Sequence, residues 1–85
     1  MAEKKLIGTI THFFGGLSVA VIELKDNLKV GDKIIIEGAT TSFEQPVNSM
    51  QIDRKDIKEA KKGDDIGMKV KDKVRPGDKV YKVLK

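Results

Sequence analysis

Apolar and β-branched residues occur in short runs along the whole chain, and polar turn residues separate these runs. Residues 5–14 and 17–24 form the first two runs, with Gly15-Gly16 between them. A Gly-Gly pair between two such runs is typical of a β-hairpin. The second run is apolar at both even and odd positions, which predicts a strand that is covered on both faces.

A Gly-Asp pair stands before three of the remaining runs, at Gly31-Asp32, Gly63-Asp64 and Gly77-Asp78. Glycine adopts a positive φ at little steric cost, and aspartate can accept hydrogen bonds from backbone amides just downstream, so each pair favours a turn. Apolar, often β-branched residues follow each pair, and these side chains suit a pleated sheet. We therefore predict strands over residues 33–37, 66–70 and 79–84.

Residues 43–52 predict a further strand whose alternation is interrupted. Val47 lies at an odd position, whereas Met50 and Ile52 lie at even positions, so a regular strand cannot bury all three on one face. One extra residue near Asn48-Ser49, a β-bulge, would bring them to the same side. We expect a bulge at this point.

The charged stretch 53–62 fits two structures, one helical turn or an extended loop, and in both Ile57 and Ala60 are the anchors. Six or seven short strands and no long helix predict an all-β fold. We expect a small closed antiparallel barrel, formed as one domain by residues 1–85. Its core is expected to include Ile34, Ile36, Met50, Ile66, Met68 and Val80.

Composition restricts the kinds of protein that the chain can be. The 85 residues contain no cysteine, which excludes a disulfide framework and a thiolate metal site. No apolar signal segment follows the N-terminal residues, and no run approaches the roughly 18 apolar residues that span a bilayer. We expect a soluble, cytoplasmic protein that has no membrane partner.

The net charge of +4 is concentrated in the second half of the chain. Residues 1–44 hold five lysines and six acids, whereas residues 45–85 hold twelve basic residues and seven acids. Such asymmetry indicates an anionic partner, although an ordinary solvated surface accounts for it as well. Lysines dominate, and a lysine suits phosphate better than a base edge. The candidate RNA-binding residues are Arg54, Lys55, Lys58, Lys61, Lys62, Lys69, Lys71, Lys73 and Arg75, which a closed barrel could gather into one patch.

The predicted hairpin tip, residues 12–16, is a second candidate surface. Adjacent phenylalanines on a strand point to opposite faces, so either Phe13 or Phe14 could be exposed beside His12. An exposed aromatic ring at this place could stack on a base or contact another protein. Packing of both rings in the core is the alternative.

Catalytic chemistry is not expected. His12 is the one histidine and lies within a predicted strand, the serines belong to no nucleophile motif, and Asp64-Asp65 points its two carboxylates apart. No group of residues matches a metal site, so we expect neither a metal nor a cofactor.

Several short motifs follow one another along the chain: Gly8-Thr-Ile10, residues 28–38, Val47-Asn-Ser-Met50, Ala60-Lys-Lys-Gly-Asp64, Ile66-Gly-Met-Lys-Val70 and Val74-Arg-Pro-Gly-Asp78. Together they resemble a known module, the second domain of translational GTPases such as elongation factor Tu. The chain is also similar to a C-terminal barrel of collagenase-like peptidases and to free-standing elongation-factor-like proteins.

The resemblance implies a Greek-key β-barrel and a binding role without catalysis. No Gly-x-x-x-x-Gly-Lys-Ser/Thr motif is present, so no nucleotide cofactor is expected. The first hypothesis is a module that contacts RNA or a ribonucleoprotein through its lysine-rich loops. The alternative is a protein-docking module that engages a larger enzyme, for example a collagenase-like peptidase, through Phe13-Phe14 or an exposed strand.

Overall fold

The structure, a computed structural model, describes residues 3–39 and 41–84, and these residues form strands, turns and loops without a helix. All strand pairs are antiparallel. The strands are β1 (Lys4–Phe14), β2 (Val19–Leu24), β3 (Leu28–Lys29), β4 (Lys33–Glu37), β5 (Ser42–Pro46), β6 (Met50–Ile52), β7 (Lys55–Ile57), β8 (Glu59–Ala60), β9 (Asp65–Lys69) and β10 (Lys79–Val83).

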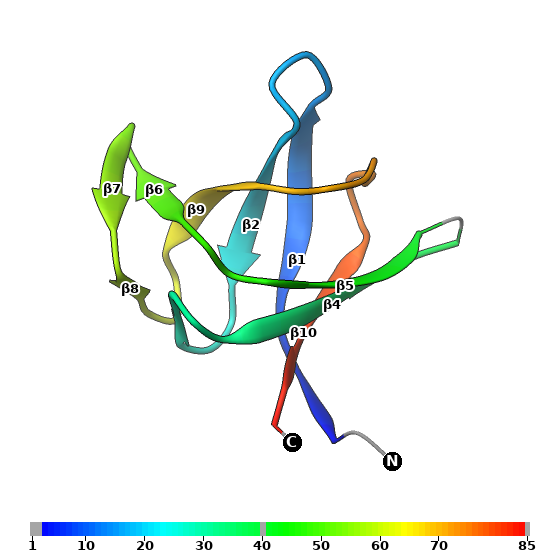
Figure 1. The fold of residues 1–85 in the computed structure, drawn as a ribbon, viewed down its shortest axis with the longest axis horizontal. Coiled ribbons are helices and arrows are strands. Elements are labelled where there is room, and N and C mark those ends of the chain that lie inside the picture. Colours follow the sequence, from blue (N-terminus) through cyan, green and yellow to red (C-terminus); the bar gives the residue numbers. More distant parts are fainter. Residues whose placement is uncertain (1–2, 40, 85) are drawn as a thin grey trace.

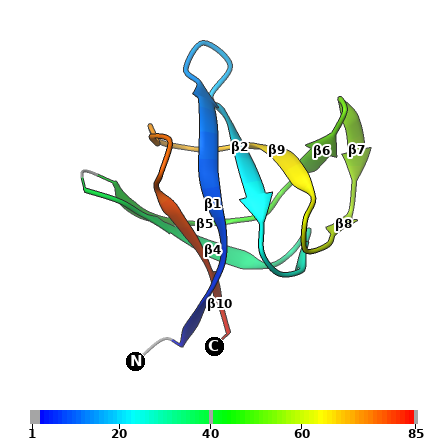
Figure 2. The same cartoon turned by 180° about the vertical axis from the view of Figure 1, so that it is seen from behind.

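Eight strands form one sheet in the order β5-β4-β10-β1-β2-β9-β6-β7, and β3 pairs with β8 in a separate two-stranded sheet. The large sheet curls around the core, with the β1–β2 hairpin projecting at one end (Figures 1 and 2). Within the described residues the paired strands end at β5 and β7, so the backbone ladder is an open sheet. The all-β prediction is confirmed.

A side chain links the edge strand β5 to the end of β9, with which β5 forms no backbone ladder. The Gln45 side chain is buried in β5, and its Nε2 donates a hydrogen bond to the Lys69 carbonyl oxygen at 3.1 Å. Its Oε1 accepts a hydrogen bond from the Lys71 backbone N–H at 2.9 Å. One amide side chain therefore connects β5 to the end of β9 where no backbone ladder does so.

One apolar cluster fills the interior of the curled sheet. All six residues expected in the core are buried in it: Ile34, Ile36, Met50, Ile66, Met68 and Val80. Ile7, Ile10, Ile22 and Leu28 add large side chains that are almost completely buried. Among the residues described, no helix has the length and apolar character needed to cross a bilayer.

The three Gly-Asp turns open β4, β9 and β10, as predicted. Gly31, Gly63 and Gly77 have φ values of 102°, 94° and 97°. The aspartates, however, accept hydrogen bonds from upstream amides, not from downstream ones. The carboxylates of Asp32, Asp64 and Asp78 accept from the backbone N–H groups three residues earlier, at Lys29 (3.1 Å), Lys61 (2.9 Å) and Arg75 (2.9 Å).

The predicted strand over residues 43–52 is two strands, β5 and β6. Residues 47–49 lie between them outside regular strand structure. This break places Val47 and Met50 in the core although their positions differ in parity. The extra length expected at Asn48-Ser49 is present, but as a break between strands and not as a bulge within one strand.

The charged stretch 53–62 is extended, which was one of the two expected structures. Ile57 packs against the core and Ala60 is buried within it. β6 and β7 form a hairpin with Asp53 and Arg54 as its two-residue loop. Their φ values of 51° and 67° are those of a type I′ turn, which sequence inspection missed because neither residue is glycine or asparagine.

Candidate docking surface on the outer face of the sheet

The tip of the β1–β2 hairpin directs its two phenylalanines to opposite faces. Phe13 is half-buried and packs against the core, whereas the Phe14 side chain is 52% exposed. His12 is exposed on the same side as Phe14, and the two ring centroids lie 6.5 Å apart at an interplanar angle of 28°. Of the two alternatives, one exposed ring is therefore the one observed.

The strand next to this tip has apolar residues on its outer face. Ala20, Ile22 and Leu24 of β2 point into the core, and Val19 and Val21 point outward. The sequence predicted a covering element over the outward residues. Within residues 3–39 and 41–84 they are instead half-buried at the floor of an open groove.

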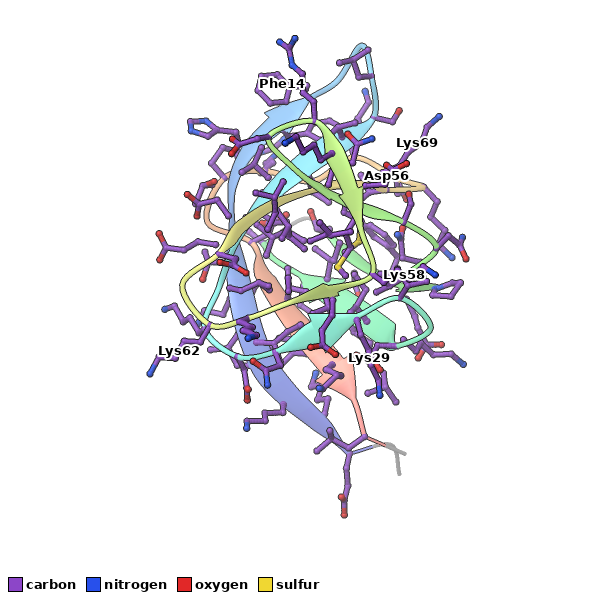
Figure 3. The ribbon with its side chains drawn as sticks, turned by 90° about the vertical axis from the view of Figure 1, so that its left-hand side faces the viewer. Phe14, Lys29, Asp56, Lys58, Lys62 and Lys69 are labelled. Atoms are coloured by element: carbon purple, nitrogen blue, oxygen red, sulfur yellow. The ribbon has the colours of Figure 1, made fainter. Side chains whose placement is uncertain are left out.

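This apolar groove has a volume of about 450 Å³ and lies between the hairpin tip and the turn that joins β6 to β7. Figure 3 shows Phe14 at the upper end of this face, next to that turn. The turn at residues 15–18 places Leu17, which is 68% exposed, on the same wall as Phe14. The lining residues are Phe14, Leu17, Val19, Val21, Gln51, Asp53, Arg54, Asp65, Ile66 and Gly67.

Sequence inspection identified Phe14 and Arg54 but missed most of this groove. The signal was present in residues 17–24, which are apolar at both even and odd positions and so predict cover on both faces of β2. Gly67 gave no signal of its own, because its role depends on the pairing of β9 with β2 and β6.

The basic residues divide between two regions. The first group is exposed along β7, β8 and the adjacent turns: Arg54, Lys55, Lys58, Lys61 and Lys62. The second group lies at the end of β9 and in segment 70–78: Lys69, Lys71, Lys73 and Arg75. Segment 70–78 runs beside the tip of the β4–β5 hairpin, away from β7 and β8 (Figures 1 and 2). In Figure 3, Lys62 lies far from Lys69, whereas Lys58 of the first group lies on the same side of the molecule as Lys69.

The second basic group surrounds an aromatic ring. Lys73 and Arg75 line a pocket of about 340 Å³ together with Phe43 and Asp72. The Lys71 Nζ atom lies 5.9 Å from the centroid of the Phe43 ring. Asp72 places a carboxylate among these cations, so this region is a mixed surface and not a uniformly positive one.

His12 has its ring beside that of Phe14 at the hairpin tip. The described residues contain no cluster of three or more histidine, cysteine or acidic side chains that could hold a metal ion. One carboxyl has a perturbed pKa: hydrogen bonds from the Lys5 side chain and from the Asn27 backbone N–H hold the pKa of Asp26 below its ordinary value. Asp26 lies between β2 and β3, outside both candidate surfaces.

The chain is similar to one part of several longer proteins. No protein-family model matches the chain. It is 50% identical over 80 residues to a protein of Methanocaldococcus jannaschii named as an uncharacterized protease, a match that covers 93% of this chain and 20% of that protein. It is 37% identical over 82 residues to a collagenase of Porphyromonas gingivalis, covering 94% of this chain and 23% of the collagenase. The chain therefore spans about a fifth of the length of these relatives.

The fold matches a domain of a peptidase-class protein. The crystal structure of the C-terminal domain of a Geobacillus thermoleovorans protein, classed by name as a U32 peptidase, superposes with a TM-score of 0.86 at 16% identity. The match covers 92% of this chain and 91% of that domain. Its selenomethionine variant gives a TM-score of 0.85. Of the module types that the sequence resembles, these findings support the peptidase-associated one.

Proposed function

We propose that this chain is a non-catalytic docking module that binds the body of a collagenase-like peptidase through the hairpin tip and the apolar groove beside it. The observation that carries the proposal is the outer face of β2, where Val19 and Val21 form an apolar floor next to exposed Phe14 and Leu17. Aromatic side chains are enriched at the centres of protein interfaces, so exposed Phe14 is the expected anchor of this surface.

The relatives support a peptidase as the partner. In each relative the polypeptide outside the matching part is about three to four times as long as that part. In such a protein a small all-β unit has a large neighbouring surface to contact. Because Phe14 and the groove face away from the core, they are available for this contact without any change to the fold.

RNA binding through the lysine-rich loops, the first hypothesis from the sequence, receives less support from the structure. The nine basic residues divide between two regions, and acidic residues are interleaved with them. The comparisons favour the protein-docking alternative. RNA binding is kept as a measured outcome of the experiment.

The test uses the Methanocaldococcus jannaschii relative with its matching segment deleted, which we call the peptidase remnant. We expect this chain to bind the remnant in a calorimetric titration, and Phe14→Ala to raise the Kd at least tenfold, as removal of an interface aromatic does. Leu84→Ala is the matched control, because Leu84 is 50% exposed against 52% for Phe14, follows the last residue of β10 and does not line the groove. Its Kd should stay within twofold of the unmodified chain.

Two further measurements guard this test. The full-length relative should not bind the chain, because its own matching segment already occupies the surface that the chain would contact. If the remnant lacks a cooperative thermal transition, we replace the matching segment of the full-length relative by this chain. We then expect the amides of β2 to exchange more slowly in that fusion than in the isolated chain. Absence of binding to a folded remnant, together with salt-dependent binding of a labelled oligonucleotide, would favour the RNA hypothesis.

A further inference from the structure

We infer that the apolar groove binds an extended segment of the peptidase partner that carries a large apolar side chain and, beside it, a lysine or arginine. This inference rests on the proposed function and adds the chemistry of the bound segment. The apolar side chain lies over Gly67, against Val19 and Val21. The basic side chain lies at the end of the groove where Glu23 of β2 faces Asp65 of β9.

Gly67 is the first reason for the inference. It lies in the middle of β9, paired with Val21 on one side and Gln51 on the other. A β-carbon added to Gly67 would lie 3.6 Å from Val19 Cγ1 and 3.9 Å from the Gln51 carbonyl oxygen, both ordinary contact distances. The packing of the fold therefore does not require glycine here. Glycine within a strand weakens it and often marks the close approach of a ligand or of another backbone.

Gly8 shows what a glycine required by packing looks like in the same sheet. A β-carbon on Gly8 would lie 2.8 Å from the Glu23 carbonyl oxygen and 2.8 Å from Ile22 Cγ2, so a side chain at Gly8 would collide with β2. At Gly67 the side chain is missing on the open face, and its absence deepens the groove. We assign this space to an atom group of the bound segment.

The second reason is the charge at one end of the groove. Glu23 and Asp65 are directly opposite one another on neighbouring antiparallel strands, and both are exposed. Like charges in this position are destabilising. Within the described part of the chain neither carboxylate takes part in a salt bridge. Asp53 adds a third carboxylate on the wall, against one cation at Arg54.

This acidic end selects the partner. A lysine or arginine of the bound segment would relieve the repulsion between Glu23 and Asp65 and gain two charge-assisted hydrogen bonds. A nucleic acid backbone would be repelled there, although the whole chain carries a charge of +4. Lys69 stands opposite Val19 near the other end of the groove, so the two ends differ in charge and give the segment a direction.

The experiment titrates the peptidase remnant with variants of the complete chain. Gly67→Leu fills the floor of the groove and should raise the Kd at least tenfold, with Gly67→Ala giving a smaller increase in the same direction.

Glu23→Lys should also raise the Kd at least tenfold. Its thermal midpoint should not fall, since the change replaces a like-charged pair with an oppositely charged one, so a loss of binding cannot come from unfolding. Glu44→Lys is the control, with the same charge change at an exposed position of the edge strand β5, and should leave the Kd within twofold.

The outcomes separate this inference from the proposed function. If the unmodified chain binds the remnant and both Gly67→Leu and Glu23→Lys bind it with the same Kd, the inference is overturned and the docking proposal stands. Absence of binding to a folded remnant would overturn both. Sedimentation of the chain alone is measured as well, and a dimer that Gly67→Leu dissociates would make a second copy the occupant and overturn the inference.

Discussion

The turns that open β4, β9 and β10 and the turns that border the apolar groove both use left-handed backbone, but they fill it with different residues. In the first set the residues with positive φ are Gly31, Gly63 and Gly77. At the groove they are Ser18, Asp53 and Arg54, which are the non-glycine residues with positive φ in the described part of the chain. A bulky residue in this region is strained, whereas glycine is not.

The two sets of turns differ in what their side chains contact. Those of the Gly-Asp turns stabilise the turn itself, whereas those at the groove are directed to the surface. Each Gly-Asp turn is closed from within, because the aspartate carboxylate accepts a hydrogen bond from a backbone N–H of its own turn. Asp53 and Arg54 instead present their side chains to the groove. Strained residues that persist at a surface concentrate at functional sites.

The largest effect is expected at the third Gly-Asp turn. A β-carbon on Gly38 would lie 1.9 Å from Oδ1 of Asp78, which is buried and held by the Arg75 N–H. Gly38→Ala should lower the free energy of unfolding by about 3 kcal/mol, the upper part of the range for overpacking. In an Asp78→Ala background the same change should cost much less, because the clash is gone. Urea denaturation of the four proteins measures this coupling, and additive losses would contradict it.

Gly63→Ala should give the next largest effect, through the backbone alone. Gly63 has a φ of 94° and no heavy atom within 4 Å of an added β-carbon. An L-residue in this region costs about 1–2 kcal/mol, so the free energy of unfolding should fall by that amount. Gly16→Ala is the control, since Gly16 also has open space around it but no positive φ. Equal losses in the two variants would show that left-handed backbone is not the cause.

The sequence was informative where local chemistry determines the structure. Gly-Asp pairs specify turns by themselves, so β4, β9 and β10 were predicted close to their observed bounds. The clean alternation of Ile66, Met68 and Val70 predicted which residues are buried. Phe14 was recognised as a candidate because adjacent residues of a strand must face opposite ways.

What the sequence did not reveal depends on pairing between distant strands. The turn at Asp53-Arg54 lacks the glycine that usually follows aspartate in a type I′ turn, so the β6–β7 hairpin was missed. Gly67 is informative only once β2 and β6 are known to flank it. Gln45 reads as a surface residue of a strand, yet it is buried and bonded to residues about 25 positions away. Such contacts have no local signature.

Arg54→Gly should act in the opposite direction from Gly63→Ala. The change gives the β6–β7 loop an Asp-Gly pair, which is favoured in type I′ turns. Glycine relieves the strain of the left-handed arginine backbone, which stabilises the fold, but it also makes the unfolded chain more flexible, which offsets part of the gain. The free energy of unfolding should therefore rise by about 0.5–1 kcal/mol. Arg54→Ala removes the same side chain but keeps the strain, so it should give no increase. A gain in both variants would point to the loss of the charge instead of the backbone.

Gly67→Ala should have the smallest effect on stability, and it separates the floor of the groove from the packed sheet around Gly8. Because an added β-carbon at Gly67 meets only ordinary contacts, the change should raise the free energy of unfolding by about 0.5 kcal/mol, as replacement of glycine within a strand does. Gly8→Ala should lower it, since the β-carbon would lie 2.8 Å from the Glu23 carbonyl oxygen. Thermal and urea denaturation of both variants give the comparison. A loss of stability at Gly67 would mean that the glycine serves the fold itself, and the open groove floor would then need no partner to account for it.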